Sequence, residues 1–197
     1  MKLLCTKRSP YARKIRVMAM EKKIPLELLE EDLTNKSSFL LETNPLGKIP
    51  ALILDNGQTI VDSPVICEYL ESIQPQPVLI PPQKDKRFYV LHWAAVADGL
   101  MDVTVAAYME KVRHPQDPNE AFIKAQEETV LRTLGICEKN IDGLKEFTMA
   151  TIALACAIGY INFRMPHLNP QNKFPNLAKW FEEFDKRPSM METKPVI

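Results

Sequence analysis

The sequence has no excess of charge of either sign, because its 25 lysines and arginines balance 25 aspartates and glutamates. A chain that binds nucleic acid or an acidic membrane surface usually carries a clear positive excess, so neither partner is expected. Metal-binding and redox motifs are also missing. The three histidines form no paired ligand motif, and the cysteines lie far apart with no Cys-x-x-Cys spacing, at Cys5, Cys67, Cys137 and Cys156. We therefore expect neither a metal site nor a disulfide framework.

The sequence also lacks long apolar runs. The amino terminus contains no apolar stretch long enough for a signal peptide. No later run reaches the roughly 18 apolar residues that a membrane-spanning helix requires. We therefore expect no membrane association and a cytoplasmic location.

Acidic residues are missing from the first twenty positions, so the amino-terminal segment is locally basic. The simplest interpretation is a solvated basic face that the acids between Glu27 and Asp32 neutralise. The basic residues that precede the first acid, Glu21, are Lys2, Lys7, Arg8, Arg13, Lys14 and Arg16.

What is present is an alternation of short strand-like and helix-like segments over the first 73 residues. Asp55-Asn56-Gly57 between two apolar runs indicates a β-hairpin, since glycine can take the positive φ of a tight turn. Apolar residues at helical spacing indicate the helices. The expected order is strand 2–5, helix 10–23, strand 26–30, a connecting segment, hairpin strands 49–54 and 59–61, and helix 64–73. This order predicts a small α/β sandwich.

A proline-rich stretch, QPQPVLIPPQ at residues 74–83, interrupts this pattern, and no helix can run through it. Beyond it the pattern is helical throughout, which predicts a compact helical bundle. The expected helices cover residues 88–112, 120–141, 147–163 and 177–186. We therefore expect an α/β domain at 1–75, a linker at 76–85 and an all-helical domain at 86–197.

Two Ser-Pro pairs mark the starts of helices in the first domain. Ser9-Pro10-Tyr11-Ala12 has the form of a Cys-Pro-Tyr-Cys redox turn in which serine and alanine replace both cysteines. Serine caps free backbone amides and proline favours the first helical position. The pair recurs at Ser63-Pro64 after Asp62. Both helices are thus expected to begin with an exposed hydroxyl at a partly positive helix end, which stabilises anions. Simple capping, without a ligand, is the simpler interpretation of either pair taken alone.

Pro50 stands at the head of an expected strand, where a central strand would need an amide. If the Ile49-Pro50 bond is cis, the chain turns there and leaves the Ile49 backbone free to pair with an extended ligand. A trans proline that begins an edge strand is the alternative.

These segments together resemble the cytosolic glutathione transferases over nearly the whole chain. The resemblance is carried, in the family's order and around the proline-rich linker, by SPYARKIRV, NPLGKIPAL, DSPVICEYL, FTMATIALACAIGYINFR and WFEEFDKRPS. It implies a thioredoxin-like domain that binds glutathione and an all-helical domain that completes the site for a second substrate. It also implies a homodimer, and glutathione as a co-substrate with no other cofactor.

The resemblance assigns roles to individual residues. Ser9 faces the glutathione sulfur and favours its thiolate, as in bacterial members with serine at this position. The Ile49 backbone, before Pro50, pairs with the cysteinyl part. Asp62 takes the γ-glutamyl ammonium, and Ser63 at the helix start takes its carboxylate. A weaker assignment places three residues along the glycyl side: Leu33, Lys36 and Lys48.

The second substrate is expected to be an apolar electrophile. Helical spacing places Met101, Val105 and Tyr108 on one face of the first long helix of the bundle, and Tyr11 could meet them. The alternative is that this stripe is simply core.

One departure from the family concerns the central bundle helix, which usually begins with a Ser/Thr-x-x-Asp capping box. Here Thr151 stands where the acid is expected, after Thr148. Losing the acid should cost about 1 kcal/mol through the cap and the helix dipole. On this basis Thr151→Asp is expected to raise the melting temperature.

Three functions remain open. The first is conjugation of glutathione to electrophiles or glutathione-dependent reduction of peroxides. The second is an interaction or stress-regulatory protein with this fold and no turnover. The third is a glutathione-dependent thiol-disulfide reductase, for which Cys5 is the only candidate cysteine near the site.

Overall fold

The computed structural model describes residues 1–195, which divide into two compact units. The first unit comprises Met1–Arg87 together with residues 188–195, and the second comprises Phe88–Arg187. The sequence prediction placed the whole carboxyl-terminal part in the helical domain. The structure differs because α9 (Pro188–Glu192) packs on α1 (Pro10–Glu21), where Arg13 Nη2 donates a hydrogen bond of 2.9 Å to Met190 O.

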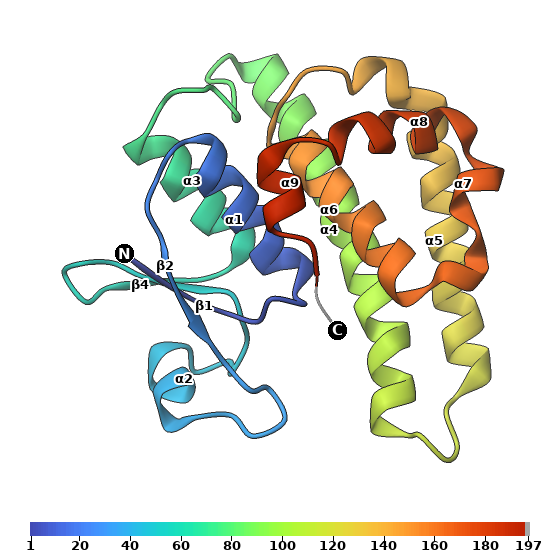
Figure 1. Cartoon of the computed structure of the whole chain (residues 1–197), viewed down its shortest axis with the longest axis horizontal. Coiled ribbons are helices and arrows are strands. Elements are labelled where there is room, and N and C mark those ends of the chain that lie inside the picture. Colours follow the sequence, from blue (N-terminus) through green and yellow to red (C-terminus); the bar gives the residue numbers. More distant parts are fainter. Residues whose placement is uncertain (196–197) are drawn as a thin grey trace. The chain divides into compact units, whose positions relative to one another are not determined.

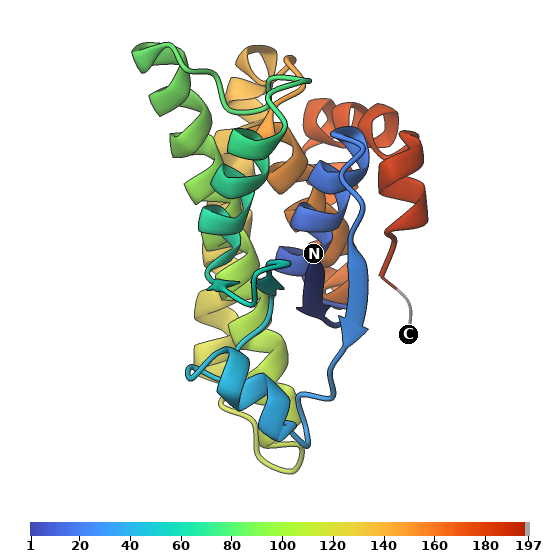
Figure 2. The same ribbon diagram turned by 90° about the vertical axis from the view of Figure 1, so that its left-hand side faces the viewer.

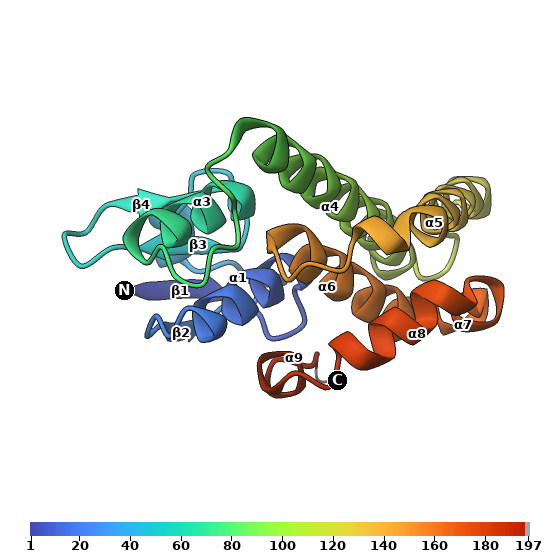
Figure 3. The same cartoon turned by 90° about the horizontal axis from the view of Figure 1, so that it is seen from above.

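The first unit is built on a mixed four-stranded sheet with the strand order β2-β1-β3-β4 (Figure 3). β1 runs parallel to β2 and antiparallel to β3, and β3 and β4 form the expected hairpin. Each strand falls within a segment that the sequence predicted. Their bounds are Lys2–Cys5 for β1, Glu27–Glu30 for β2, Ala51–Ile53 for β3 and Thr59–Ile60 for β4.

Helices cover both faces of the sheet. On one face, α2 (Ser38–Thr43) places Leu40 in a buried cluster with Leu4 and Ala51. Because side chains alternate along a strand, Leu3 and Leu52 point to the other face, where both are fully buried. There α1 and α3 (Ser63–Ile73) lie side by side (Figure 1). The layers are therefore those of a thioredoxin-like domain.

Two of the basic residues of α1 are buried, so the expected solvated basic face is wrong for them. Arg13 is 3% exposed because α9 and the residues that follow it pack on α1, and Lys14 is fully buried. The expectation holds nearer the amino terminus, where the Lys2 ammonium lies 3.7 Å from Glu27 and the Lys7 ammonium 3.2 Å from Glu30.

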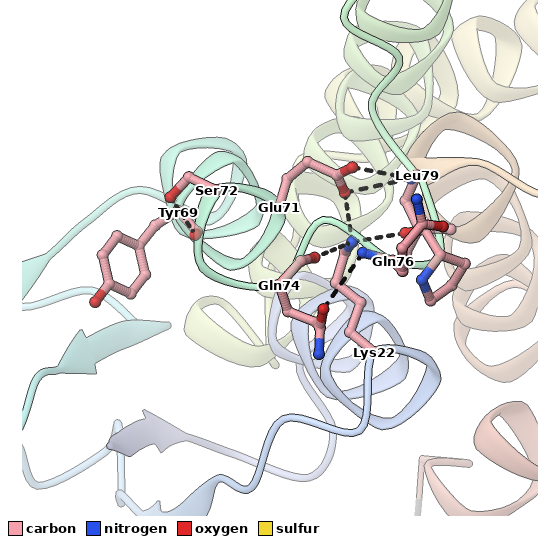
Figure 4. A network of polar contacts seen from close by, with 8 residues as sticks. Lys22, Tyr69, Glu71, Ser72, Gln74, Gln76 and Leu79 are labelled. Carbon is pink, nitrogen blue, oxygen red and sulfur yellow. Dashed lines mark hydrogen bonds and ion pairs between the residues drawn. The ribbon is translucent and has the colours of Figure 1, made fainter.

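A buried lysine anchors the proline-rich stretch to the two helices (Figure 4). Lys22, which follows α1, has a fully buried side chain whose Nζ lies 2.7 Å from Glu71 Oε2 on α3. The same Nζ donates to the carbonyl oxygens of Gln74 and Pro77, each at 2.7 Å. Glu71 in turn accepts from the Leu79 N–H at 3.2 Å. These contacts fix the path of the chain as it leaves the α/β unit.

The second unit is helical, as the sequence predicted. α6 is its central element and is buried along nearly its whole length. α4 and α5 run in opposite directions and are joined by a short loop (Figure 2). The helices are α4 (Lys84–Arg113, which begins in the first unit), α5 (Glu120–Asn140), α6 (Met149–Arg164), α7 (Pro170–Lys173) and α8 (Pro175–Phe184), with 3₁₀ turns at Ile141–Gly143 and Pro166–Leu168.

Among the described residues, one helix is long and apolar enough to cross a membrane, judged by its length and composition alone. The sequence analysis had predicted none. α4 contains an 18-residue window with a mean hydropathy of 1.3, and 44% of that window is buried within the protein. α6 and α7 pass only when taken together, across a bend of 95°. This is weak evidence for a membrane span, since core helices of globular proteins pass the same test.

Candidate active site

The segments that carry the site residues in the first unit all leave the sheet at one end. In the register, Cys5 pairs with Glu30, Leu4 with Ala51 and Leu52 with Ile60. The carboxyl ends of β1, β2 and β4 therefore meet the amino end of β3. Neighbouring strands lie about 4.8 Å apart, so the loops that follow or precede them span roughly 14 Å along this edge. Sequence-distant residues are thus brought into one row.

Ser9 lies at the end of the loop that follows β1 and is the N-cap of α1, as predicted. Its Oγ accepts a hydrogen bond from the Ala12 N–H at 3.2 Å, and Pro10 follows in the first turn. The side chain is half-buried. Because Oγ acts as an acceptor towards the helix, its own proton is available to donate to a ligand. The positive end of α1 faces the same place.

Ile49 lies before β3, and the Ile49-Pro50 peptide bond is cis. Within residues 1–195, no protein group is hydrogen-bonded to the backbone N–H or C=O of Ile49. Its side chain packs against the cluster of Leu4, Leu40 and Ala51, which fixes its position. The structure therefore presents an unpaired backbone donor and acceptor at the middle of the row.

A buried asparagine, to which the sequence analysis gave no role, shapes the loop before Ile49. Asn44 is 2% exposed, and its Nδ2 donates to Lys48 O at 2.8 Å while its Oδ1 accepts from the Leu46 N–H at 3.1 Å. Gly47 has a φ of +57°, which favours glycine. The signal that could have found Asn44 is its place directly before a Pro-x-Gly turn.

Asp62 and Ser63 follow β4, and the structure corrects the expectation for them. Asp62, not Ser63, is the N-cap of α3, and its Oδ1 accepts from the Ser63 N–H. Ser63 is the first helical residue and is 1% exposed, so the expected exposed hydroxyl at this helix start is wrong. The reason is that the carboxylate one residue earlier already serves as the cap.

The first turn of α3 nevertheless offers hydrogen-bond donors. Within the described residues, neither the Ser63 hydroxyl nor the Val65 N–H has a protein partner. Val65 was not singled out from the sequence, because a backbone group carries no residue-type signal. Asp62 itself is exposed, and its charge is available to a cation beside these donors. A carboxylate and an ammonium on one ligand could therefore both be held here.

The three residues assigned to the glycyl side lie in the loops beside β2 and β3. Leu33 is exposed and follows β2. Lys36 lies across Gly47, since a Cβ built on that glycine would stand 3.0 Å from Lys36 Nζ. Lys48 is exposed, and its carbonyl is held by Asn44. The two lysines thus belong to neighbouring loops of the same unit.

Cys5 is a poor candidate for redox chemistry. It is 1% exposed at the end of β1, and burial raises the pKa of its thiol. A thiol of this kind stays protonated at neutral pH, whereas thiol-disulfide exchange requires the thiolate.

The residues expected to meet the second substrate are divided between the units. Tyr11 is half-buried on α1, and Met101, Val105 and Tyr108 lie on α4. Met101 is fully buried, while Val105 and Tyr108 are partly exposed. Tyr108 is covered by Arg164, the last residue of α6, whose guanidinium carbon lies 3.9 Å from the centre of the Tyr108 ring.

Comparisons with known proteins identify the family. The family model for the glutathione S-transferase N-terminal domain matches residues 8–73, and the model for the C-terminal domain matches residues 96–188. The uncharacterized GST-like protein YibF of Escherichia coli K12 is 35% identical over 199 residues, which cover 99% of this chain and 98% of YibF. The chain belongs to the glutathione S-transferase family.

Two solved structures are similar over almost their full length. A glutathione transferase family member from Pseudomonas fluorescens Pf-5, with bound glutathione, is 36% identical with a TM-score of 0.92, and the match covers 100% of this chain and 99% of that one. A glutathione S-transferase from Methylobacillus flagellatus KT, also with glutathione bound, is 38% identical with a TM-score of 0.93 and 99% coverage of both chains.

Proposed function

We propose that this protein is a glutathione transferase that activates the glutathione thiol for attack on electrophiles, or for the reduction of peroxides. The observation that carries the proposal is the row of groups along one sheet edge. From β4 to β2 it offers a carboxylate and donors for an amino acid head group, the unpaired backbone groups of Ile49, the capping hydroxyl of Ser9 and the loop that carries Lys36. Lys48 lies next to Ile49, in the loop before β3. Glutathione binding by the similar Pseudomonas and Methylobacillus proteins supports the same assignment.

The order of these groups matches the order of the parts of glutathione. The γ-glutamyl ammonium would contact Asp62, and its carboxylate the Ser63 hydroxyl and the Val65 N–H. The cysteinyl backbone would pair with Ile49 N–H and C=O, as an added strand pairs with a sheet edge. The glycyl carboxylate would lie towards the loops beside β2 and β3, where three residues are assigned to it: Leu33, Lys36 and Lys48.

Ser9 would then act on the sulfur. A thiol with a pKa of about 8.5 is mostly protonated at neutral pH, and the thiolate is the nucleophile. A hydrogen bond from the Ser9 hydroxyl and the positive end of α1 both favour the thiolate, which lowers the pKa of the bound thiol. The sulfur forms a bond to the electrophilic carbon, the leaving group departs with its electron pair, and the thiol proton goes to solvent.

Glutathione enters this scheme as a co-substrate, and no metal or other cofactor takes part. A homodimer, a cytoplasmic location and a role in detoxification belong to the proposal through the family resemblance. An apolar body of the second substrate would contact the partly exposed Val105 and Tyr108.

The two other candidate functions find less support in the structure. A reductase would need a reactive cysteine, and Cys5 is buried with a raised pKa. A pure interaction protein would have no use for the unpaired backbone of Ile49 beside Asp62 and Ser9.

The test compares Ser9→Ala with Cys5→Ser in conjugation to 1-chloro-2,4-dinitrobenzene. Removing a hydrogen bond to an anion costs about 1.5–3 kcal/mol, so Ser9→Ala should lower kcat roughly 10- to 150-fold while sparing glutathione affinity. Cys5→Ser should retain turnover. Loss of turnover in Cys5→Ser together with normal turnover in Ser9→Ala would contradict the mechanism proposed for Ser9.

A further inference from the structure

A buried asparagine holds one side of the peptide unit that presents the Ile49 N–H. Asn44 is 2% exposed and is the C-cap residue of α2. Its Nδ2 donates to Lys48 O at 2.8 Å, and its Oδ1 accepts from the Leu46 N–H at 3.1 Å. The backbone carbonyl of Asn44 also accepts from the Gly47 N–H, at 2.7 Å. The loop between α2 and Ile49 is therefore tied to this one residue.

The carbonyl that Asn44 holds belongs to the same peptide unit as the Ile49 N–H. A peptide unit is planar, and in a trans unit the C=O and N–H groups point in opposite directions. The Lys48-Ile49 unit is trans. Because Nδ2 fixes Lys48 O, it also fixes the direction of the Ile49 N–H, which points away from Asn44. The Ile49 side chain packs against the buried cluster beneath α2, and this contact holds the other end of the unit.

The two contacts of the Asn44 side chain have different reach. The bond from the Leu46 N–H closes a local turn, which asparagine makes in many loops. The bond to Lys48 O instead extends to the peptide unit at the site. That carbonyl can only accept, so it requires a donor, and the side-chain amide supplies one beside its acceptor oxygen. A hydrogen bond to a peptide carbonyl also polarises the unit and strengthens its N–H as a donor.

We propose that Asn44 is a positioning residue for glutathione, because it aims the Ile49 N–H at the carbonyl of the ligand's cysteinyl residue. This inference rests on the proposed function, in which the cysteinyl backbone pairs with Ile49. Asn44 is buried and acts through the Lys48-Ile49 peptide unit. The Ile49 C=O belongs to the next peptide unit, over which Asn44 has less control. Loss of the Asn44 amide should therefore weaken the contact with the ligand's carbonyl and spare the contact with its N–H.

The experiment measures the affinity for three ligands by calorimetry. The first ligand is reduced glutathione. In the second, an (E)-alkene replaces the amide between cysteine and glycine, which removes the cysteinyl carbonyl. In the third, an ester replaces the amide between the γ-glutamyl group and cysteine, which removes the cysteinyl N–H and keeps the carbonyl. All three ligands have the same charged ends, so they differ only in the backbone groups that Ile49 would meet.

The variants remove the amide donor or weaken the same helix at its other end. Asn44→Asp keeps the size and the acceptor but has no donor for the carbonyl. Asn44→Ser is the second variant, since a serine hydroxyl can also accept from the N–H two residues later. Ser37→Ala is the matched control, because Ser37 Oγ caps α2 by accepting from the Leu40 N–H at 3.0 Å. Melting curves verify that each variant is folded.

Both Asn44 variants should bind glutathione and the ester about 2- to 12-fold more weakly than the wild-type protein, which corresponds to one neutral hydrogen bond. They should bind the alkene as well as the wild-type protein does, because the ligand group in question is already absent. Ser37→Ala should change all three affinities by one common factor.

An equal loss of affinity for all three ligands in the Asn44 variants would overturn the inference, because it would mean only a general loss of structure. Undiminished glutathione binding in a folded Asn44 variant would overturn it too. So would a wild-type protein that binds the alkene as tightly as glutathione, a comparison that requires no variant. These outcomes refute this inference alone, whereas no binding of glutathione to the wild-type protein refutes the proposed function and this inference with it.

Discussion

At the scale of single residues, the buried ammonium of Lys22 depends on Glu71 and on two carbonyl oxygens. Removing one partner of a buried pair leaves the other charge uncompensated, at a cost of about 3–5 kcal/mol. Lys22→Met should therefore lower the free energy of unfolding by about that amount in urea titrations. Lys186→Met is the control: the Lys186 ammonium lies 2.7 Å from Glu183, but both side chains are exposed.

The double variant Lys22→Met/Glu71→Leu separates the cost of leaving one buried charge unpaired from the cost of lost side-chain packing. Replacing both charges by apolar groups of similar volume is often neutral, so most of the lost stability should return. A double variant no more stable than Lys22→Met would contradict this account of the anchor.

Cys137 gives a pH dependence whose sign can be stated. The residue is fully buried on α5, and burial raises the pKa of its thiol from 9.0 to about 12. In the unfolded chain the thiol loses its proton near its ordinary pKa, whereas in the folded chain the thiol keeps it. The unfolded state therefore binds fewer protons above pH 9. Because of this difference, the free energy of unfolding falls as pH rises from 9 towards 12. The contribution is full below pH 9, and its slope is at most about 1.4 kcal/mol per pH unit.

Chemical denaturation at several pH values between 9 and 11 measures this slope. Cys137→Ala should show a shallower loss of stability with pH than the unmodified protein, because one thiol no longer titrates in the unfolded chain. Identical slopes in the two proteins would show that the Cys137 pKa is not raised.

At the scale of elements, the start of α6 differs from what the sequence alone suggested. The Thr151 hydroxyl accepts from the Thr148 N–H at 2.9 Å, and it lies within donating distance of Glu146 O and Thr148 O at 3.1 and 2.9 Å. Threonine thus already supplies the acceptor that the missing acid was expected to supply. Thr151→Asp would therefore raise the melting temperature only through the favourable interaction of a negative charge with the amino-terminal end of the helix dipole.

Thr151→Val tests this cap, because valine keeps the shape and removes the hydroxyl. We expect a loss of about 1–2 kcal/mol in the free energy of unfolding. Thr129→Val is a control, since the Thr129 hydroxyl donates to Ala125 O on an exposed turn of α5. An equal, small effect of both substitutions would mean that the cap contributes little.

Some helices and strands can be predicted from the sequence, and others cannot. The sequence predicts β1, α1 and α3 to within two residues, because apolar residues mark all three and a Ser-Pro pair marks the start of each helix. The six-residue helix α2 was missed, since a helix so short has no periodicity, and its cap by Ser37 is visible only in the structure. The return of α9 to α1 depends on contacts between residues nearly 180 positions apart, such as Arg13 and Met190.

At the scale of the whole molecule, the row of site residues is a product of strand order. Ser9, Ile49 and Asp62 carried recognisable local signals, but only the pairing of β1, β3 and β4 brings their loops to one sheet edge. The unpaired Val65 N–H has no such signal, because a backbone group is the same in every residue type except proline. The residue types therefore predict which chemical groups the site contains, and the strand order determines that they lie together.

The central claim is that this edge binds glutathione, and calorimetric titration with the reduced tripeptide tests it most directly. Asp62→Asn is the informative variant, because asparagine keeps the helix cap and removes the charge. Asp55→Asn is its control, since Asp55 is an exposed acid in the β3–β4 turn at the other end of the sheet. We predict micromolar binding that Asp62→Asn weakens at least about tenfold and Asp55→Asn leaves unchanged. No heat of binding to the unmodified protein, or equal affinity in Asp62→Asn, would contradict the account.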